Sequence, residues 1–222
     1  MLSQRPTAAK PATQAQSPTI VLAPAPATSK DPVLRATYDS IMEVGVRRTT
    51  LADVSRRAGV SRMTVYRKYD DLPTLLAALL TEELGSLLEQ ANRRSQDLPD
   101  AAKRLARTTA NTAAALAAHP VLARVLAVDP EAILPLIVDR LGSTQRVGLA
   151  VITEQIKAGQ SKSGDGSIRN ADPDLMALTV LATAQSFVFS ARAIGTADPL
   201  GRVYPELELM LHNYLVESPV AP

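Results

Sequence analysis

The 222-residue chain is predicted to be all-α, with a small N-terminal helical head and a larger helical body. Three observations predict this class. Apolar residues recur three and four positions apart along most of the chain, which is the period of an amphipathic helix. Capping residues and prolines divide this pattern into segments of helical length. No stretch shows the strict apolar–polar alternation of a half-buried strand.

The composition argues against several classes of protein. Hydrophobic residues make up 46% of the chain, enough for a sizeable core in one or two domains. The chain has no Cys, which excludes disulfides, thiolate nucleophiles and cysteine zinc sites. Its two histidines, His119 and His212, lack suitably spaced carboxylates, and no P-loop, dinucleotide-binding or zinc-protease motif occurs. We therefore predict no enzyme activity, no metal and no cofactor.

Residues 1–29 form a Pro/Ala/Thr/Gln/Ser tail with five prolines and no periodicity, a composition that predicts disorder. Ala25-Pro26-Ala27 resembles a signal-peptide cleavage site. The apolar run Ile20–Ala23 is, however, much shorter than the apolar core of a signal peptide. Because the chain also lacks Cys, the expected location is the cytoplasm.

The head begins with a helix from Asp31-Pro32 to Gly45, and two shorter helices joined by a tight turn follow at residues 50–69. Thr50 starts the first of these two helices as the N-cap of a T-x-x-D capping signature. Gly59 ends it, because glycine adopts the left-handed conformation at no steric cost. A helix–turn–helix of this shape can place its second helix in the major groove of DNA.

The second of these two helices has a basic outward face. Ser61 caps it, and Val65 and Tyr69 face inward at positions i and i+4. Groups that can bond phosphates or reach base edges lie on the outward side, namely Arg62, Met63, Thr64, Tyr66, Arg67 and Lys68. Tyr66 also fits a core position. The alternative interpretation is an ordinary αα-hairpin with a solvated basic face.

Positive charge is concentrated in the head. Residues 30–70 hold nine Lys/Arg against five Asp/Glu, a net charge of +4. Residues 71–222 hold thirteen against seventeen, a net charge of −4. This asymmetry is typical of a DNA-reading head on a body that does not bind DNA.

Residues 31–80 resemble the DNA-binding domain of the TetR/AcrR family of bacterial transcriptional repressors. The family pattern T-x-x-D-I-A-x-x-A-G-V-S-x-x-T-[LV]-Y-x-x-F is matched by Thr50, Asp53, Val54, Ser55, Ala58, Gly59, Val60, Ser61, Thr64, Val65, Tyr66 and Tyr69. Ser55 replaces the usual Ala, Tyr69 replaces Phe, and Met63 stands where Gly or Pro is common. Leu72 stands where a Lys often opens the next helix, so that phosphate contact is not carried over.

The resemblance implies a three-helix DNA-binding domain at 30–72 and a six-helix effector-binding and dimerisation domain at 73–222. It also implies a homodimeric, ligand-responsive repressor on a palindromic operator. The predicted DNA-binding residues are Arg47, Arg48, Thr50, Ser61, Arg62, Met63, Thr64, Tyr66, Arg67 and Lys68. An effector-independent DNA-binding protein and a helical protein–protein adaptor remain the alternatives.

Six helices are predicted in the body, at 73–94, 100–118, 121–127, 130–158, 173–194 and 202–216. Pro135 either kinks the fourth of these or marks its true start. Residues 159–171 form a polar Gly/Ser-rich segment, for which we predict a mobile loop.

Few aromatic residues follow residue 70, so a pocket in the body would suit a flexible apolar effector such as an acyl chain or terpenoid. The alternative is a filled interior. The predicted pocket residues are Leu84, Leu88, Leu105, Thr109, Thr112, Leu116, Ile137, Leu149, Ile152 and Phe187.

The uncharged stretch 175–191 is shorter than a membrane span and is typical of a helix buried on most sides. The family dimerises through its last two long helices, so we assign that role to 173–194 and 202–216. A purely intramolecular core is the alternative. The predicted dimer contacts are Leu178, Leu181, Ala182, Phe189, Leu207, Met210, Leu211 and Tyr214.

Overall fold

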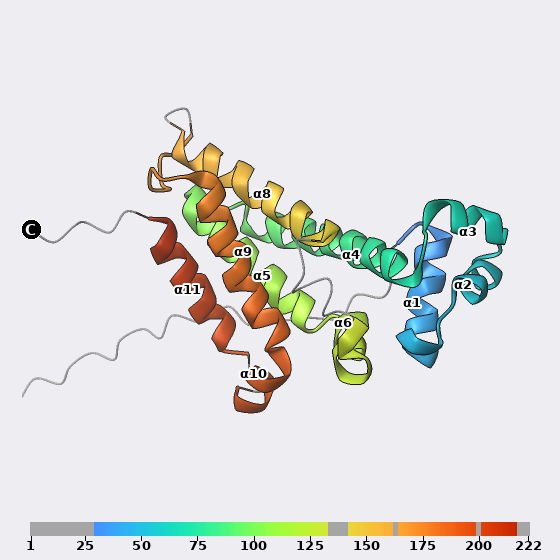
Figure 1. Cartoon of the computed structure of the whole chain (residues 1–222). Helices are drawn as coiled ribbons and strands as arrows, with labels where there is room; N and C mark the ends of the chain where they lie inside the picture. The colour runs from blue at the N-terminus through green and yellow to red at the C-terminus, as the bar shows by residue number, and fades with distance from the viewer. Residues whose placement is uncertain (1–28, 133–141, 162–163, 199–200, 217–222) are drawn as a thin grey trace, which may run out of the picture.

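Helices account for all the regular secondary structure in the computed structural model, which describes residues 29–132, 142–161, 164–198 and 201–216 (Figure 1). The predicted all-α class is thereby confirmed. The head contains α1 (Pro32–Val44), a 3₁₀ turn η1 (Val46–Arg48), α2 (Leu51–Ala58) and α3 (Arg62–Lys68). The body contains α4 (Leu72–Ser95), α5 (Ala101–Ala117), α6 (Pro120–Val128), a 3₁₀ turn η2 (Pro130–Ala132), α8 (Ser143–Gln160), α9 (Pro173–Phe189), α10 (Ala191–Ala197) and α11 (Val203–Leu215).

The predicted capping residues set the starts of the head helices. Asp31 Oδ1 accepts the Val33 N–H at 2.8 Å at the start of α1. Thr50 Oγ1 accepts the Asp53 N–H at 3.1 Å at the start of α2. Each such bond satisfies a backbone donor that has no partner within the helix. These starts are therefore fixed by residues a few positions apart in the sequence.

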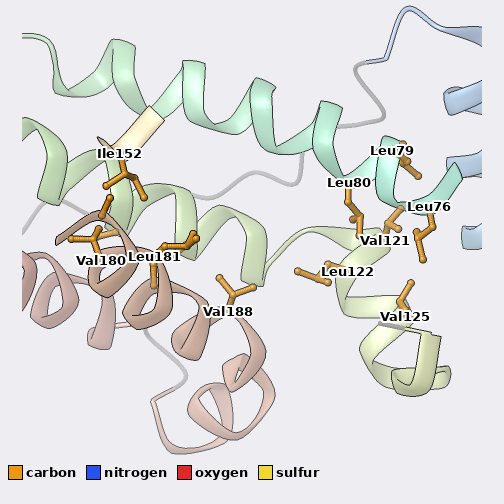
Figure 2. Close-up of a cluster of buried hydrophobic side chains, with 14 of the residues drawn as sticks. Leu76, Leu79, Leu80, Val121, Leu122, Val125, Ile152, Val180, Leu181 and Val188 are labelled. Carbon is orange, nitrogen blue, oxygen red and sulfur yellow. The ribbon is translucent and has the colours of Figure 1, made fainter. Parts of the chain in front are cut away.

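The long helix α4 joins the two parts of the molecule, because its N-terminal half packs on the head and the rest runs through the body (Figure 1). In the body, α5 lies at the centre and packs against α4, α8, α9 and α11. Figure 2 shows the apolar cluster, in which Leu76 and Leu80 of α4 point toward Val121 and Val125 of α6. Burial of such side chains supplies most of the favourable free energy of folding.

Two predicted helices differ from the structure. The segment expected as one helix over 130–158 contains the 3₁₀ turn η2 and, after residues 133–141, the separate helix α8. Residues 133–141, which include Pro135, lie outside the described part of the chain. The helix expected over 173–194 ends at Phe189, and α10 follows directly after Ser190. Hydrophobic periodicity continues through a short break of this kind, so it did not reveal the boundary.

The loop expected to be mobile is anchored where the structure describes it. Asp165 Oδ2 accepts the Ala101 N–H at 2.6 Å, and Ser167 Oγ accepts the Ala102 N–H at 3.1 Å. The loop therefore satisfies the first backbone donors of α5. Ile168 is buried in the core. Polar composition predicted a loop here, although α8 continues to Gln160, and long-range contacts hold the described part of the loop in place.

Within the described residues, no single helix is long and apolar enough to span a membrane. The helices α5 and α6 pass the length and composition test only as a pair, and they are bent by 54° at their break.

Candidate nucleic-acid interface and effector pocket

The turn between α2 and α3 presents α3 at the surface of the head. Gly59 has φ 70° and ψ 23°, the left-handed conformation that ends α2. The Val60 N–H donates to the Ser55 carbonyl at 3.1 Å and closes the turn. Val65 is the one buried residue of α3, and it is fully buried, as Val54 of α2 is. The helix is thus held by one apolar contact face and by the turn that precedes it.

Most of α3 is solvent-exposed. Met63 is 76% exposed and Tyr66 is 48% exposed. Tyr66 is therefore a surface residue, which decides between the two positions left open by the sequence. Tyr69, just after the helix, is buried as predicted. The outward residues of α3 consequently form a protruding surface of the kind that enters a major groove.

The cations of α3 differ in their partners. Lys68 Nζ bonds Asp31 Oδ2 at 2.7 Å and lies 5.1 Å from the centre of the Tyr69 ring. The hydrogen bond to Asp31 raises the pKa of Lys68 above its ordinary value. Arg62 and Arg67, by contrast, form no ion pair within the described part of the chain and are exposed. These two guanidinium groups are the ones best placed to meet phosphates or bases.

The predicted hydroxyl contacts are exposed but already hydrogen-bonded. Thr50 Oγ1 donates to Asp53 Oδ2 at 2.6 Å in addition to capping α2. Ser61 and Thr64 share a hydrogen bond of 2.8 Å between their hydroxyls, and Ser61 also caps α3. Each hydroxyl oxygen still has acceptor capacity. Their first structural role is to fix the ends of the two helices.

Arg47 is directed toward the body, whereas the sequence suggested a contact with DNA. Its Nε lies 2.6 Å from Asp129 Oδ1 and its terminal nitrogen lies 2.7 Å from Glu131 Oε2. Asp129 is buried and directly follows α6. The neighbouring Arg48 is exposed and donates from Nε to the Val44 carbonyl at 3.0 Å. Arg47 therefore joins the head to the end of α6 in this structure.

A second polar contact lies at the same junction. Glu83 of α4 and His119, just before α6, are both buried, and His119 Nε2 lies 3.4 Å from Glu83 Oε2. The ring of Tyr38 from α1 meets His119 edge-on, with centroids 6.3 Å apart. Burial, together with the nearby Glu83 carboxylate, raises the pKa of Tyr38. The head thus meets α4 and α6 through polar as well as apolar side chains.

The body contains a pocket of about 150 Å³, lined by residues of α4, α5, α6, α8 and α9. Seven predicted pocket residues line it: Leu84, Leu88, Leu105, Thr109, Thr112, Leu116 and Ile152. Leu149 and Phe187 instead pack against the core, and Ile137 lies outside the described residues. The sequence reasoning missed several lining residues, including Thr108, Leu122, Gly148 and Gln185. Thr108 could have been found from the sequence, because it lies four positions before the predicted pocket residue Thr112 and therefore on the same side of the helix.

The predicted dimer contacts fall into three groups: exposed, buried and half-buried. Leu178 and Ala182 of α9 and Met210 of α11 are exposed, whereas Leu181, Leu207 and Leu211 are buried in the single chain. Those three leucines are therefore core residues with no surface left for another copy. Phe189 lines the pocket, and the half-buried Tyr214 packs under Arg169, with 4.8 Å between the guanidinium carbon and the ring centre.

Two further exposed leucines extend the apolar surface on these helices. Leu175 lies on the same face of α9 as Leu178 and Ala182, and Leu209 lies beside Met210 on α11. The exposed face of α9 from Leu175 to Ser186 contains no charged residue. Among the described residues, no group of three or more His, Cys, Asp or Glu side chains is arranged to hold a metal ion.

The chain is similar to known proteins over most of its length. The family profile described as "Bacterial regulatory proteins, tetR family" matches residues 33–79. The uncharacterized HTH-type transcriptional regulator Rv2250c of Mycobacterium tuberculosis H37Rv is 30% identical over 187 residues, which cover 82% of this chain and 92% of that protein.

Two solved structures show the same fold. A TetR-family transcriptional regulator from Pectobacterium atrosepticum is 20% identical with a TM-score of 0.61, covering 84% of this chain and 94% of that one. The transcriptional regulator FadR from Bacillus subtilis, solved in complex with stearoyl-CoA, is 17% identical with a TM-score of 0.56, covering 83% and 98%. TetR-family proteins are regulators rather than enzymes; they bind DNA, dimerise and bind small-molecule effectors. The chain described here belongs to the TetR family of transcriptional regulators.

Proposed function

We propose that this regulator is a ligand-responsive repressor that binds a palindromic operator as a homodimer. The observation that carries the proposal is the exposed surface of α3, where Arg62 and Arg67 are free of ion pairs within the described residues. Arg62 and the adjacent Met63 and Thr64 lie near the N-terminus of α3, the part of a recognition helix that meets base edges. Arg67, in the last turn, suits a phosphate.

We assign DNA binding to residues 30–72 and effector binding and dimerisation to residues 73–222. Dimerisation would use the exposed faces of α9 and α11. Leu175 and Leu178 of α9 are large apolar side chains exposed to solvent, and so are Leu209 and Met210 of α11. Large apolar side chains that are exposed on neighbouring helices are typical of an interaction site. Two heads related by a two-fold axis would then read half-sites about 34–36 Å apart.

Substitution of Leu178 by Glu tests the proposed dimer face. A buried carboxylate at a two-fold interface would have no partner, so Leu178→Glu should sediment as a monomer and lose affinity for the full operator. Val128→Glu is the matched control, because Val128 is 50% exposed on α6, away from that face. It should remain dimeric. A wild-type protein that is monomeric at micromolar concentration would contradict the dimer.

The pocket supports effector response over effector-independent binding. Helix α4 carries the lining residues Leu84 and Leu88 and also packs on the head. Helix α6 contributes Leu122 to the pocket, and Asp129 at its other end pairs with Arg47 of the head. An effector that binds better to a conformation with shifted α4 or α6 would move the heads and lower the population that fits DNA.

Selection of binding sites from random DNA duplexes tests the whole proposal. The expected result is a palindrome whose half-sites are about one helical turn apart, as a symmetric dimer requires. In a gel-shift assay, a compound that binds the pocket should then release the selected duplex from the protein. Failure to enrich any sequence would contradict sequence-specific binding. Enrichment without release by any compound would favour an effector-independent regulator.

A further inference from the structure

The pocket is elongated rather than round. Its described lining residues on α5 extend from Leu105 to Leu116, and those on α8 extend from Thr144 to Gln155. Each set spans about 16 Å along its helix axis. A compact cavity of about 150 Å³ holds a benzene ring, whereas the same volume spread over this length forms a narrow channel. The shape therefore suits an extended chain better than a ring.

The labelled side chains of Figure 2 follow this elongation. Ile152 and Leu181 lie at one side of the cluster, Leu122 and Leu80 lie toward the other, and Val188 lies between them. All five line the pocket. The end at Leu122 and Leu80 is the one nearer the head, because α6 and α4 contact α1.

Helices α5 and α8 run antiparallel along the pocket. Near the head, the hydroxyls of Thr81 of α4 and Thr144 at the start of α8 are 2.8 Å apart. Far from the head, the end of α8 approaches the start of α5, since a Cβ added at Gly159 would lie 2.9 Å from the Cβ of Ala101. This pairing places Gln155, four residues before Gly159, at the end of the pocket far from the head.

Two polar side chains toward this far end are open to a ligand. Thr109 and Gln155 line the pocket and form no side-chain hydrogen bond within the described residues. The hydroxyl of Thr108 is fully enclosed by protein, whereas their polar atoms keep accessible surface. The pairing of Gly159 with Ala101 places Thr109 about 6 Å from Gln155 along the axis. A ligand hydroxyl between them is within reach of both, because the glutamine side chain is long and flexible.

The pocket wall is uncharged. Its described lining residues are aliphatic apart from Phe189, four threonines and three glutamines. An ion moved from water into such a wall loses its hydration and finds no opposite charge there. The lining therefore disfavours a carboxylate or an ammonium group inside the pocket.

We propose that the pocket binds a linear, uncharged amphiphile of about eight carbons, whose terminal oxygen is hydrogen-bonded by Thr109 and Gln155 and whose chain extends toward the head along α5. At about 1.2 Å per bond, an extended eight-carbon alcohol spans roughly 10 Å, which fits within the lined length. This inference rests on the proposed effector function and specifies the shape, the charge and the anchor of the effector.

Calorimetric titration with four eight-carbon probes tests the shape and the charge. The probes are 1-octanol, cyclooctanol, octanoate and octylamine at pH 7, where the last two are charged. For the wild type we expect binding of 1-octanol, roughly tenfold weaker binding of cyclooctanol, and no binding of the two ions. Cyclooctanol, octanoate or octylamine binding as tightly as 1-octanol would overturn the inference, and so would no binding of 1-octanol.

Two variants test the anchor. Thr109→Val and Gln155→Leu keep the approximate size and remove the hydrogen-bonding group, so each should weaken 1-octanol binding by about three- to tenfold. Thr109→Ser keeps the hydroxyl and should bind 1-octanol within about twofold of the wild type. Unchanged affinity in Thr109→Val or in Gln155→Leu would refute the anchor.

Gln185→Leu is the matched control for Gln155→Leu. Gln185 is also a half-buried amide of the pocket wall, but it lies on α9 between Leu181 and Val188, nearer the head. Its replacement should leave 1-octanol binding within about twofold of the wild type, because the proposed hydrogen bonds remain. A loss equal to that of Gln155→Leu would contradict an anchor at the far end.

Release of operator DNA separates this inference from the effector function on which it rests. 1-Octanol should release the operator from the wild type, and from Gln155→Leu only at about three- to tenfold higher concentration. Release by a cyclic or charged compound, without binding of 1-octanol, would refute the ligand class and leave the effector function standing. No release by any compound, with 1-octanol still binding in the calorimeter, would refute the effector function and leave the binding site standing.

Discussion

Replacement of Arg67 by Ala should reduce the salt dependence of DNA binding. Arg67 is exposed in the last turn of α3 and has no carboxylate partner within the described residues. On DNA it would neutralise a phosphate and release a condensed counterion. Lys68 is the internal comparison, because its ammonium is already bound to Asp31 at 2.7 Å. Loss of Lys68 should therefore change the salt dependence less than loss of Arg67.

The magnitude follows from the number of lost phosphate contacts. Each neutralised phosphate contributes about −0.9 to the slope of log affinity against log salt. A dimer carries two copies, so Arg67→Ala should make the slope shallower by about 2. Between 50 and 200 mM salt, the affinity difference between wild type and variant should consequently shrink by about tenfold.

Fluorescence anisotropy with a labelled operator duplex at several salt concentrations measures these slopes. Arg94→Ala is the matched control, because Arg94 is an exposed cation in the last turn of the 24-residue helix α4. The helix is about 36 Å long and only its N-terminal half packs on the head, so this change near its C-terminal end should leave the slope unaltered. An Arg67→Ala slope equal to that of the wild type, or an equal change in Arg94→Ala, would refute the assignment.

Four further predictions concern the stability of the head and its junction with the body. Arg47→Ala should lower the free energy of unfolding by about 1–2 kcal/mol, because it leaves the buried Asp129 without the guanidinium. Arg48→Ala should lower the free energy of unfolding by less. Urea denaturation compares the two variants. Val65→Ala should lower the free energy of unfolding by about 2 kcal/mol and weaken binding to every DNA sequence, since it removes the buried contact of α3. Wild-type stability in this variant would show that contacts other than Val65 hold α3 in place. Gly59→Ala should lower the free energy of unfolding by about 1 kcal/mol, because the backbone has a positive φ and an added Cβ meets no atom within 4 Å. A much larger loss of stability in thermal denaturation would reveal a clash. The pKa of Asp71 is lowered by its hydrogen bonds with Thr74. The stability contributed by this carboxylate is therefore complete above about pH 4–5 and is lost as the pH falls through the lowered pKa. Asp71→Asn keeps a cap and should remove this part of the acid dependence when stability is measured between pH 2 and 7.

The head could be predicted almost fully from the sequence because short-range interactions set its elements. The cap at Thr50 acts on a residue three positions away, and Gly59 determines its own backbone conformation. Val65 and Tyr69 are four positions apart on one face, so helical geometry placed both inward. The same local reasoning predicted seven of the 21 described pocket-lining residues, and six of these seven recur along α4 and α5 at helical spacing.

The body was predicted less well because apolar periodicity does not tell which apolar face meets which partner. Helix α9 is apolar nearly all round, so the sequence could not separate Leu178, which is exposed, from Leu181, which is buried. The break at Ser190 interrupts the chain direction without interrupting the apolar pattern.

The sequence by itself determined the all-α class, the helix–turn–helix and the basic character of α3, because capping, turn formation and net charge depend on residues close together in the chain. Only the tertiary structure decided which cations remain free for DNA. Arg47 is occupied by Asp129 and by Glu131, 84 positions away, and Lys68 by Asp31, 37 positions away. Such pairs form only when folding brings distant segments together, and they reduce the charge available to a phosphate backbone.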